Sequence, residues 1–274
     1  MVQPDPPPST ESDAPSASEN SPSQPVEPAG LRLHRPAWIA AAVVVAVALV
    51  AALTVFVATR GSEPDGAVAG DADRVVSGPV GGREQATFVL LDGASSVTLR
   101  AEPLDDVLYR ASTPDGGAEL PVASQDGDEV RVELVDSGEP GSSALAVVLN
   151  SDVQWQIRIL GGATEQIIDL GEGSVGSVEL AGGASRIELT LPPPQGTTTV
   201  RMSEGAGDWY VYQVGDAPVQ VHIGAGAGAV TIDGAVESGV AGGTVFTPDG
   251  WEAAADRVDI DAAAGVSALV VERS

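Results

Sequence analysis

The 274-residue sequence contains no cysteine and no lysine, and it has only two histidines. The absence of cysteine excludes disulfide bonds, thiolate nucleophiles and cysteine-ligated metal centres. Two separated histidines do not assemble a nucleophile–base pair or a histidine-rich metal site, and no G-x-S-x-G segment is present. We therefore expect a protein that is not an enzyme, with no catalytic residues, no cofactor and no metal site.

Positive charge is also scarce. The chain has 13 arginines against 39 acidic residues, which gives a formal net charge of −26 at pH 7. Nucleic-acid binding depends on basic side chains that contact phosphates, and adsorption to anionic lipid depends on them too. The charge therefore argues against nucleic acid as a partner and against peripheral binding to a membrane surface.

One long apolar run is present, from Ala37 to Ala58, and it carries no charged side chain. As a helix it would extend roughly 33 Å, about the hydrocarbon thickness of a bilayer. Arg32 and Arg35 precede the run and Arg60 follows it, a bias that favours a cytoplasmic N-terminus. A cleaved signal peptide is the alternative, but the apolar core of such a peptide is usually only about 7 to 15 residues long. We predict an uncleaved single-pass anchor in the lipid bilayer of the cell membrane.

Composition divides the chain into four parts around this run. Residues 1–30 are rich in proline, serine and acids, and they have too little apolar surface to fold, so we expect a disordered cytoplasmic tail. Residues 31–60 hold the anchor and its flanks, and residues 61–73 form a linker of glycine, proline and acids. Residues 74–274 are then expected to form an acidic domain outside the cell.

Short alternating segments fill residues 74–274. Apolar and polar residues alternate with period two between glycine, proline, aspartate or serine, a pattern typical of half-buried strands, as in residues 96–100, 129–134, 155–159 and 186–191. Several strand pairs are joined by a glycine-rich turn that needs positive φ or close backbone approach. Residues 240–255 are the least regular part. The sequence predicts an all-β domain, a solenoid-like stack of short strands with glycine-rich turns.

Four segments carry a resemblance to a known family: VVLNSDVQWQIRILGGATEQIIDL, GGASRIELTLPPPQG, VQVHIGAGAGAVTIDG and DRVDIDAAAGVSALVVER. They resemble the bacterial putative-adhesin, or toast-rack β-solenoid, family, to which the C-terminal domains of LiaF-like cell-envelope stress proteins are related. The resemblance covers roughly residues 75–274, and residues 75–150 repeat less clearly than the rest. It implies a stack of short strands outside the membrane and no catalytic residues, and it assigns no ligand.

Two further patterns could be interpreted either as ligand-binding sites or as ordinary parts of the β-structure. The run GAGAG at residues 224–228 has the composition of a phosphate loop, but such a loop opens a helix and here a strand follows. Asp259 and Asp261 share a strand face that could offer oxygen ligands to calcium, although EF-hand spacing is absent and a solvated acidic face is the commoner explanation. His222 shares the polar face of its strand with Gln220, so we expect it to face solvent.

Trp209, Tyr210 and Tyr212 form the densest aromatic group of the chain. Strand alternation places Tyr210 and Tyr212 on one face and Trp209 on the other, with one face in the core and the other partly exposed. Exposed aromatic rings stack on sugars or dock on partner proteins. Packing within the sheet is the commoner role of strand aromatics. These three residues are the candidate interaction residues.

The sequence thus favours a non-catalytic envelope interaction or sensing protein. It would present its β-domain outside the cell and bind a membrane-protein or cell-wall partner there. The alternative is a surface adhesin or a cell-wall glycan-binding module.

Overall fold

The computed structural model describes residues 74–274. The predicted tail (residues 1–30), the predicted anchor (residues 37–58) and the predicted linker (residues 61–73) lie outside the described residues. Strands make up most of the described part, and no α-helix occurs in it. Accordingly, this range holds no helix with the length and apolar character that a membrane span requires.

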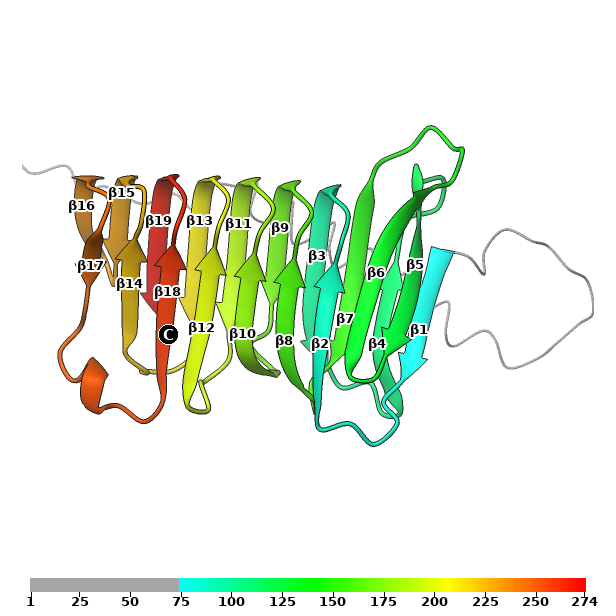
Figure 1. The fold of residues 1–274 in the computed structure, drawn as a ribbon, viewed down its shortest axis with the longest axis horizontal. Coiled ribbons are helices and arrows are strands. Elements are labelled where there is room, and N and C mark those ends of the chain that lie inside the picture. The colour runs from blue at the N-terminus through cyan, green and yellow to red at the C-terminus, as the bar shows by residue number, and fades with distance from the viewer. Residues whose placement is uncertain (1–73) are drawn as a thin grey trace, which may run out of the picture. The chain divides into compact units, whose positions relative to one another are not determined.

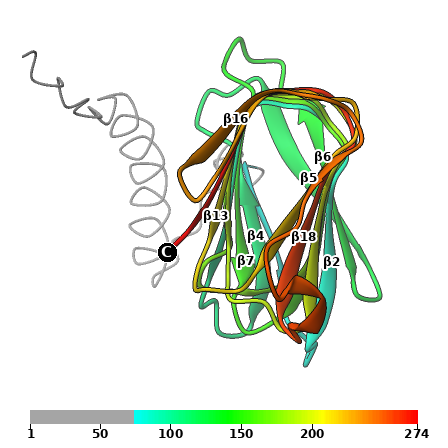
Figure 2. The ribbon, with the colours of Figure 1, turned by 90° about the vertical axis from the view of Figure 1, so that its left-hand side faces the viewer.

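Two large sheets face each other across one apolar core (Figures 1 and 2). Sheet A has ten strands: β1 (Val75–Pro79), β3 (Ala94–Glu102), β4 (Val107–Ser112), β7 (Ala144–Asn150), β9 (Ala163–Asp169), β11 (Ala184–Leu191), β13 (Ala206–Gln213), β15 (Ala227–Ile232), β16 (Ala235–Val240) and β19 (Val266–Arg273). Sheet B has nine strands: β2 (Gln85–Leu90), β5 (Glu119–Asp126), β6 (Glu129–Asp136), β8 (Gln154–Ile159), β10 (Ser174–Leu180), β12 (Thr197–Met202), β14 (Val219–Ile223), β17 (Thr244–Phe246) and β18 (Arg257–Ala262).

The stack is built from repeated pairs of strands, one strand in each sheet. β2 continues into β3, β6 into β7, β8 into β9, β10 into β11, β12 into β13, β14 into β15, and β18 into β19. Neighbouring pairs run parallel to each other in both sheets. Parallel neighbours need a connection through another layer, and here the opposite sheet supplies it in place of a helix. The all-β domain of stacked strands predicted from the sequence is confirmed.

The spatial order of the pairs differs from their order in the sequence. The C-terminal pair β18–β19 lies between β12–β13 and β14–β15, and the first pair β2–β3 lies between β6–β7 and β8–β9. Antiparallel strands close both ends of the stack: β1, β4 and β5 at one end, β16 and β17 at the other. Between β17 and β18, within the segment expected to be least regular, lies only a short 3₁₀ turn, η2 (Trp251–Ala253).

Six turns from sheet B to sheet A are three residues long, and each ends in glycine. They form the upper rim of the stack in Figure 1. A Cβ atom on Gly93 would lie 2.7 Å from the carbonyl oxygen of Gly162, and one on Gly182 would lie 2.2 Å from the backbone of Gly161. Among the six final glycines only Gly226 has a positive φ, 117°. These turns therefore need glycine mainly because successive turns stack closely, and only at Gly226 because of a positive φ.

The core consists of apolar side chains that point inward from both sheets. Trp155, Trp209 and Phe88 are its largest members, and all three are fully buried. Parallel sheets are usually covered on both faces and read as continuous apolar runs. Within residues 74–274 the two sheets cover each other's inner faces and leave the outer faces more exposed, which is why the sequence alternates with period two.

Candidate interaction surfaces

The aromatic group on β13 divides between the core and the outer face of sheet A. Tyr210 and Tyr212 lie half-buried on the outer face, as the alternation predicted. Trp209 points inward and has no exposed surface. A ring inside the core cannot contact a partner while the domain is folded, so Trp209 is a core residue and leaves the set of candidate interaction residues.

Arg186 on β11 holds the ring of Tyr210 in place. Its guanidinium carbon lies 4.5 Å from the centroid of that ring, and its Nε donates a hydrogen bond of 2.8 Å to Glu188 Oε1. Burial alone would lower the pKa of Arg186, but the hydrogen bonds and charges of Glu188 and Tyr210 more than offset it and raise the pKa. The cluster of Arg186, Glu188 and Tyr210 is therefore a fixed, charged feature of the outer face.

Tyr212 lies beside this cluster, in register with Thr190 on β11 and Glu272 on β19. Burial raises the pKa of Tyr212, and the negative charges of Glu188 and Glu272 raise it further. Its hydroxyl group stays protonated over the physiological range and can donate a hydrogen bond. The same charges would repel an anionic ligand at this point of the face.

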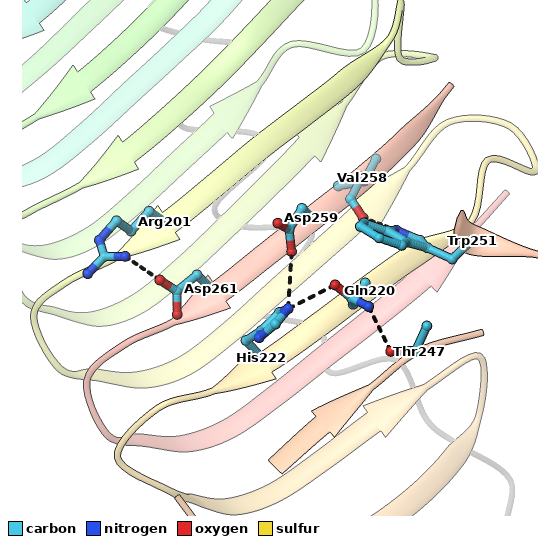
Figure 3. Close-up of polar contacts among 8 residues, drawn as sticks. All are labelled: Arg201, Gln220, His222, Thr247, Trp251, Val258, Asp259 and Asp261. Atoms are coloured by element: carbon cyan, nitrogen blue, oxygen red, sulfur yellow. Dashed lines mark hydrogen bonds and ion pairs between the residues drawn. The ribbon is translucent and has the colours of Figure 1, made fainter. Parts of the chain in front are cut away.

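On the outer face of sheet B, His222 belongs to a chain of polar contacts (Figure 3). Gln220 Nε2 donates to Thr247 Oγ1 at 2.7 Å, which turns Gln220 Oε1 toward His222 Nε2, 2.8 Å away. The geometry assigns a proton to His222 Nε2, because that atom faces an acceptor. Asp259 Oδ1 lies 3.6 Å from the same nitrogen. His222 is half-buried on the outer face, on the polar side of its strand as expected.

The carboxylates near His222 are engaged in separate contacts. Asp261 pairs with Arg201 on β12, and Asp256 accepts a hydrogen bond of 2.7 Å from the backbone N–H of Gly196. Asp259 faces His222 instead (Figure 3). Among residues 74–274 no group of three or more potential metal ligands is brought together. Asp261 is thus paired with β12, while Asp259 lies beside His222 of β14.

Trp251 fastens the η2 turn to sheet B. Its Nε1 donates to the carbonyl oxygen of Val258 at 3.1 Å, and the guanidinium carbon of Arg257 lies 4.3 Å from the centre of its ring. The turn and the Gln220–Thr247 contact together hold the segment before β18 against the sheet. The polar network around His222 is therefore part of the closure of this end of the stack.

A third feature lies where the sheet B strands begin, at the lower end of β2, β8 and β10 in Figure 1. A hollow of about 450 Å³ opens there, and polar residues line it: Glu84, Gln85, Ser151, Asp152, Gln154, Gly173, Ser174 and Gln195. Sequence reasoning missed this site because its residues come from four separate segments. The one available signal was the polar residue at or near the start of successive strands.

No protein-family model and no curated protein sequence matches the chain. The fold is similar to the crystal structure of a protein from Clostridium sporogenes described as a "putative cell adhesion protein". The TM-score is 0.54 at 15% sequence identity, and the match covers 73% of this chain and 98% of that one. At this identity the likeness concerns the fold alone. It supports an all-β fold of stacked strands for this chain.

Proposed function

We propose that the chain is a membrane-anchored, non-catalytic interaction protein of the cell envelope, which holds residues 74–274 outside the cell. The apolar run from Ala37 to Ala58, with two arginines before it and one after it, supports the anchor and its orientation. The observation that carries the binding role is the pair Tyr210 and Tyr212 on the outer face of sheet A. A sensing role follows if the bound partner is itself a membrane protein.

The two tyrosines are positioned before a partner arrives. β13 is an inner strand, paired with β11 on one side and with β19 on the other. Arg186 over the ring of Tyr210 further restricts that side chain. A fixed side chain loses less conformational entropy on binding, and tyrosine and arginine are enriched among the residues that dominate binding energy.

Charge narrows the chemistry of the partner. Residues 74–274 contain 30 acidic residues and 10 arginines, a net charge of −20. Such a domain attracts a basic surface and repels an acidic one, and it does so most strongly at low ionic strength. The partner that contacts the outer face of sheet A at Tyr210 and Tyr212, here named the tyrosine face, is accordingly a protein surface with basic residues around an apolar contact.

A pull-down from membranes with the full-length chain tests the proposal. We expect a membrane protein to be captured by the parent, retained in the presence of excess cell-wall glycan, and lost with Tyr210→Ala combined with Tyr212→Ala. Thr98→Ala is the matched control, because Thr98 is half-buried on the same face but two strands away from β11. Capture that is the same for the double variant and the control would contradict a binding role for the tyrosine face.

The topology has its own test. Protease added to intact cells should remove the chain beyond about residue 61 and spare the tail, because only the outer part is accessible. An epitope at the N-terminus that is digested while residues 74–274 survive would reverse the orientation and refute the proposal.

A surface adhesin or cell-wall glycan-binding module is the second candidate. The similarity of the fold to the protein described as a "putative cell adhesion protein" favours it. Saturable binding of the chain to purified cell-wall polysaccharide, in the absence of any protein partner, separates this candidate from the first. Loss of that binding with Tyr210→Ala and Tyr212→Ala would assign it to the tyrosine face.

A further inference from the structure

Three polar side chains form a row across neighbouring strands of sheet B. Gln85 at the start of β2 is in register with Gln154 at the start of β8, and Gln154 is in register with Ser174 at the start of β10. All three line the hollow of about 450 Å³. The parallel register repeats the same position from strand to strand, so their polar groups are presented side by side.

Gln195, Glu84 and Asp152 also line this hollow. Within residues 74–274 none of these six side chains makes a hydrogen bond or an ion pair with another residue. On the same sheet, by contrast, Arg158 and Glu179 are engaged with each other at 2.8 Å. The hollow therefore gathers polar groups whose hydrogen-bonding capacity the fold itself leaves unused.

The lining selects a class of ligand by its charge and polarity. Glu84 and Asp152 contribute two carboxylates, and no basic side chain among residues 74–274 lines the hollow, which disfavours phosphates, sulfates and uronic acids. No aliphatic or aromatic side chain of the described part lines it either, which disfavours an apolar ligand. Each glutamine offers both donors and acceptors, the combination that recognises hydroxyl groups.

We propose that this hollow, formed by Gln85, Gln154, Ser174, Gln195, Glu84 and Asp152, binds a neutral or cationic saccharide unit of the hexose or hexosamine class. Its volume falls within the roughly 300–1,000 Å³ of small-ligand sites. The carboxamides hydrogen-bond the sugar hydroxyls, and the carboxylates attract an amino group where one is present. The inference rests on the glycan-binding candidate and gives that function a site apart from the tyrosine face.

Calorimetric titration of the full-length chain in detergent micelles tests the proposal with three defined trisaccharides. Chitotriose is neutral, its fully deacetylated form is cationic, and trigalacturonate is anionic. We expect saturable binding of the first two, tighter for the cationic form because of Glu84 and Asp152, and no binding of the third. Absence of saturation by both chitin-derived probes, or equal binding of trigalacturonate, would overturn the proposal.

Variants locate the binding. Gln85→Ala combined with Gln154→Ala should weaken chitotriose binding about tenfold or more, since two hydrogen-bonding side chains are removed. Gln156→Ala should leave it unchanged, because Gln156 is exposed on the same strand but does not line the hollow. Glu84→Gln with Asp152→Asn should abolish the preference for the cationic form and retain chitotriose binding.

The tyrosine face supplies the last control. Tyr210→Ala with Tyr212→Ala should leave chitotriose binding unchanged, because these residues lie on sheet A and the hollow lies along sheet B. Loss of sugar binding in that variant alone would refute the hollow and support a glycan-binding tyrosine face. Loss of chitotriose binding in the Gln85/Gln154 variant alone would support the hollow as the sugar site, independently of what Tyr210 and Tyr212 bind.

Discussion

A Cβ atom on Gly161 would lie 2.0 Å from the backbone carbonyl of Asp92, in the turn stacked directly beside it. Real side chains do not approach a neighbouring backbone so closely, and a backbone carbonyl, unlike a flexible side chain, cannot swing aside. Gly265 ends an equivalent turn, yet no atom of the described residues would lie within 4 Å of a Cβ there. Gly161 and Gly265 thus lie in equivalent turns of the repeat, but only Gly265 has room for a side chain.

Gly161→Ala should destabilise the domain by more than about 2 kcal/mol, because two stacked turns must separate. Gly265→Ala should be neutral or stabilising by up to about 1 kcal/mol, because alanine restricts the unfolded chain and fits the folded one. Urea unfolding of both variants measures the difference. Equal midpoints for the two would show that close stacking of the turns does not constrain the sequence.

The two fully buried tryptophans should respond differently to loss of the indole N–H. Trp155 Nε1 donates a hydrogen bond of 2.8 Å to the carbonyl oxygen of Asn150, whereas Trp209 Nε1 has no acceptor among the described residues. Trp155→Phe removes a hydrogen bond, whereas Trp209→Phe removes a buried donor that has no partner among these residues. Trp155→Phe should therefore lower the free energy of unfolding by about 1 kcal/mol more than Trp209→Phe. Both changes remove the same volume, so each serves as the control for the other in thermal unfolding. A larger loss for Trp209→Phe would contradict this assignment.

Alkaline pH should destabilise the domain through Tyr212 and Tyr109. Burial raises the pKa of both hydroxyl groups above that of an unfolded tyrosine. The folded state then keeps its protons while the unfolded state loses them, so stability falls as pH rises above about 10. The unfolding free energy of Tyr212→Phe, measured from neutral to alkaline pH, should fall less steeply than that of the parent. Identical slopes would rule out this contribution from Tyr212.

Added salt should stabilise the domain, even though salt weakens its ion pairs. Arg158 and Glu179 form an ion pair in which the side chains are 45% and 38% exposed, respectively. Exposed pairs of this kind contribute under about 1 kcal/mol to folding stability. We expect repulsion within a net charge of −20 to outweigh these pairs, and salt screens that repulsion. The melting temperature should rise between low ionic strength and about 0.5 M sodium chloride. A fall over that range would show that the ion pairs dominate.

The elements of the fold were predictable because they leave a local signal. Period-two alternation marked the strands, as in Ile187 and Leu189 of β11, and glycine at the end of each short turn marked the stack. Pairing order leaves no such signal. The residues of β18 do not indicate that its neighbours are β12 and β14. Parallel pairing depends on packing between segments that are far apart in the sequence.

The candidate surfaces were predictable only in part, for the same reason. Alternation separated Trp209 from Tyr210 and Tyr212, but it could not say which face is buried, because both faces of β13 carry rings. The opposite sheet decides this by covering one face. The hollow was invisible in the sequence, because Gln85 and Gln154 become neighbours only when the strands stack.

The place of β18–β19 inside the stack has a consequence for how the protein is made. Synthesis runs from the N-terminus, so β14 to β17 leave the ribosome before the strands that join them to β12 and β13 exist. At this end the stack therefore cannot form in sequence order, because β14 and β15 contact β12 and β13 only through β18 and β19. A premature stop after residue 256 would remove an inner strand of each sheet and not its edge.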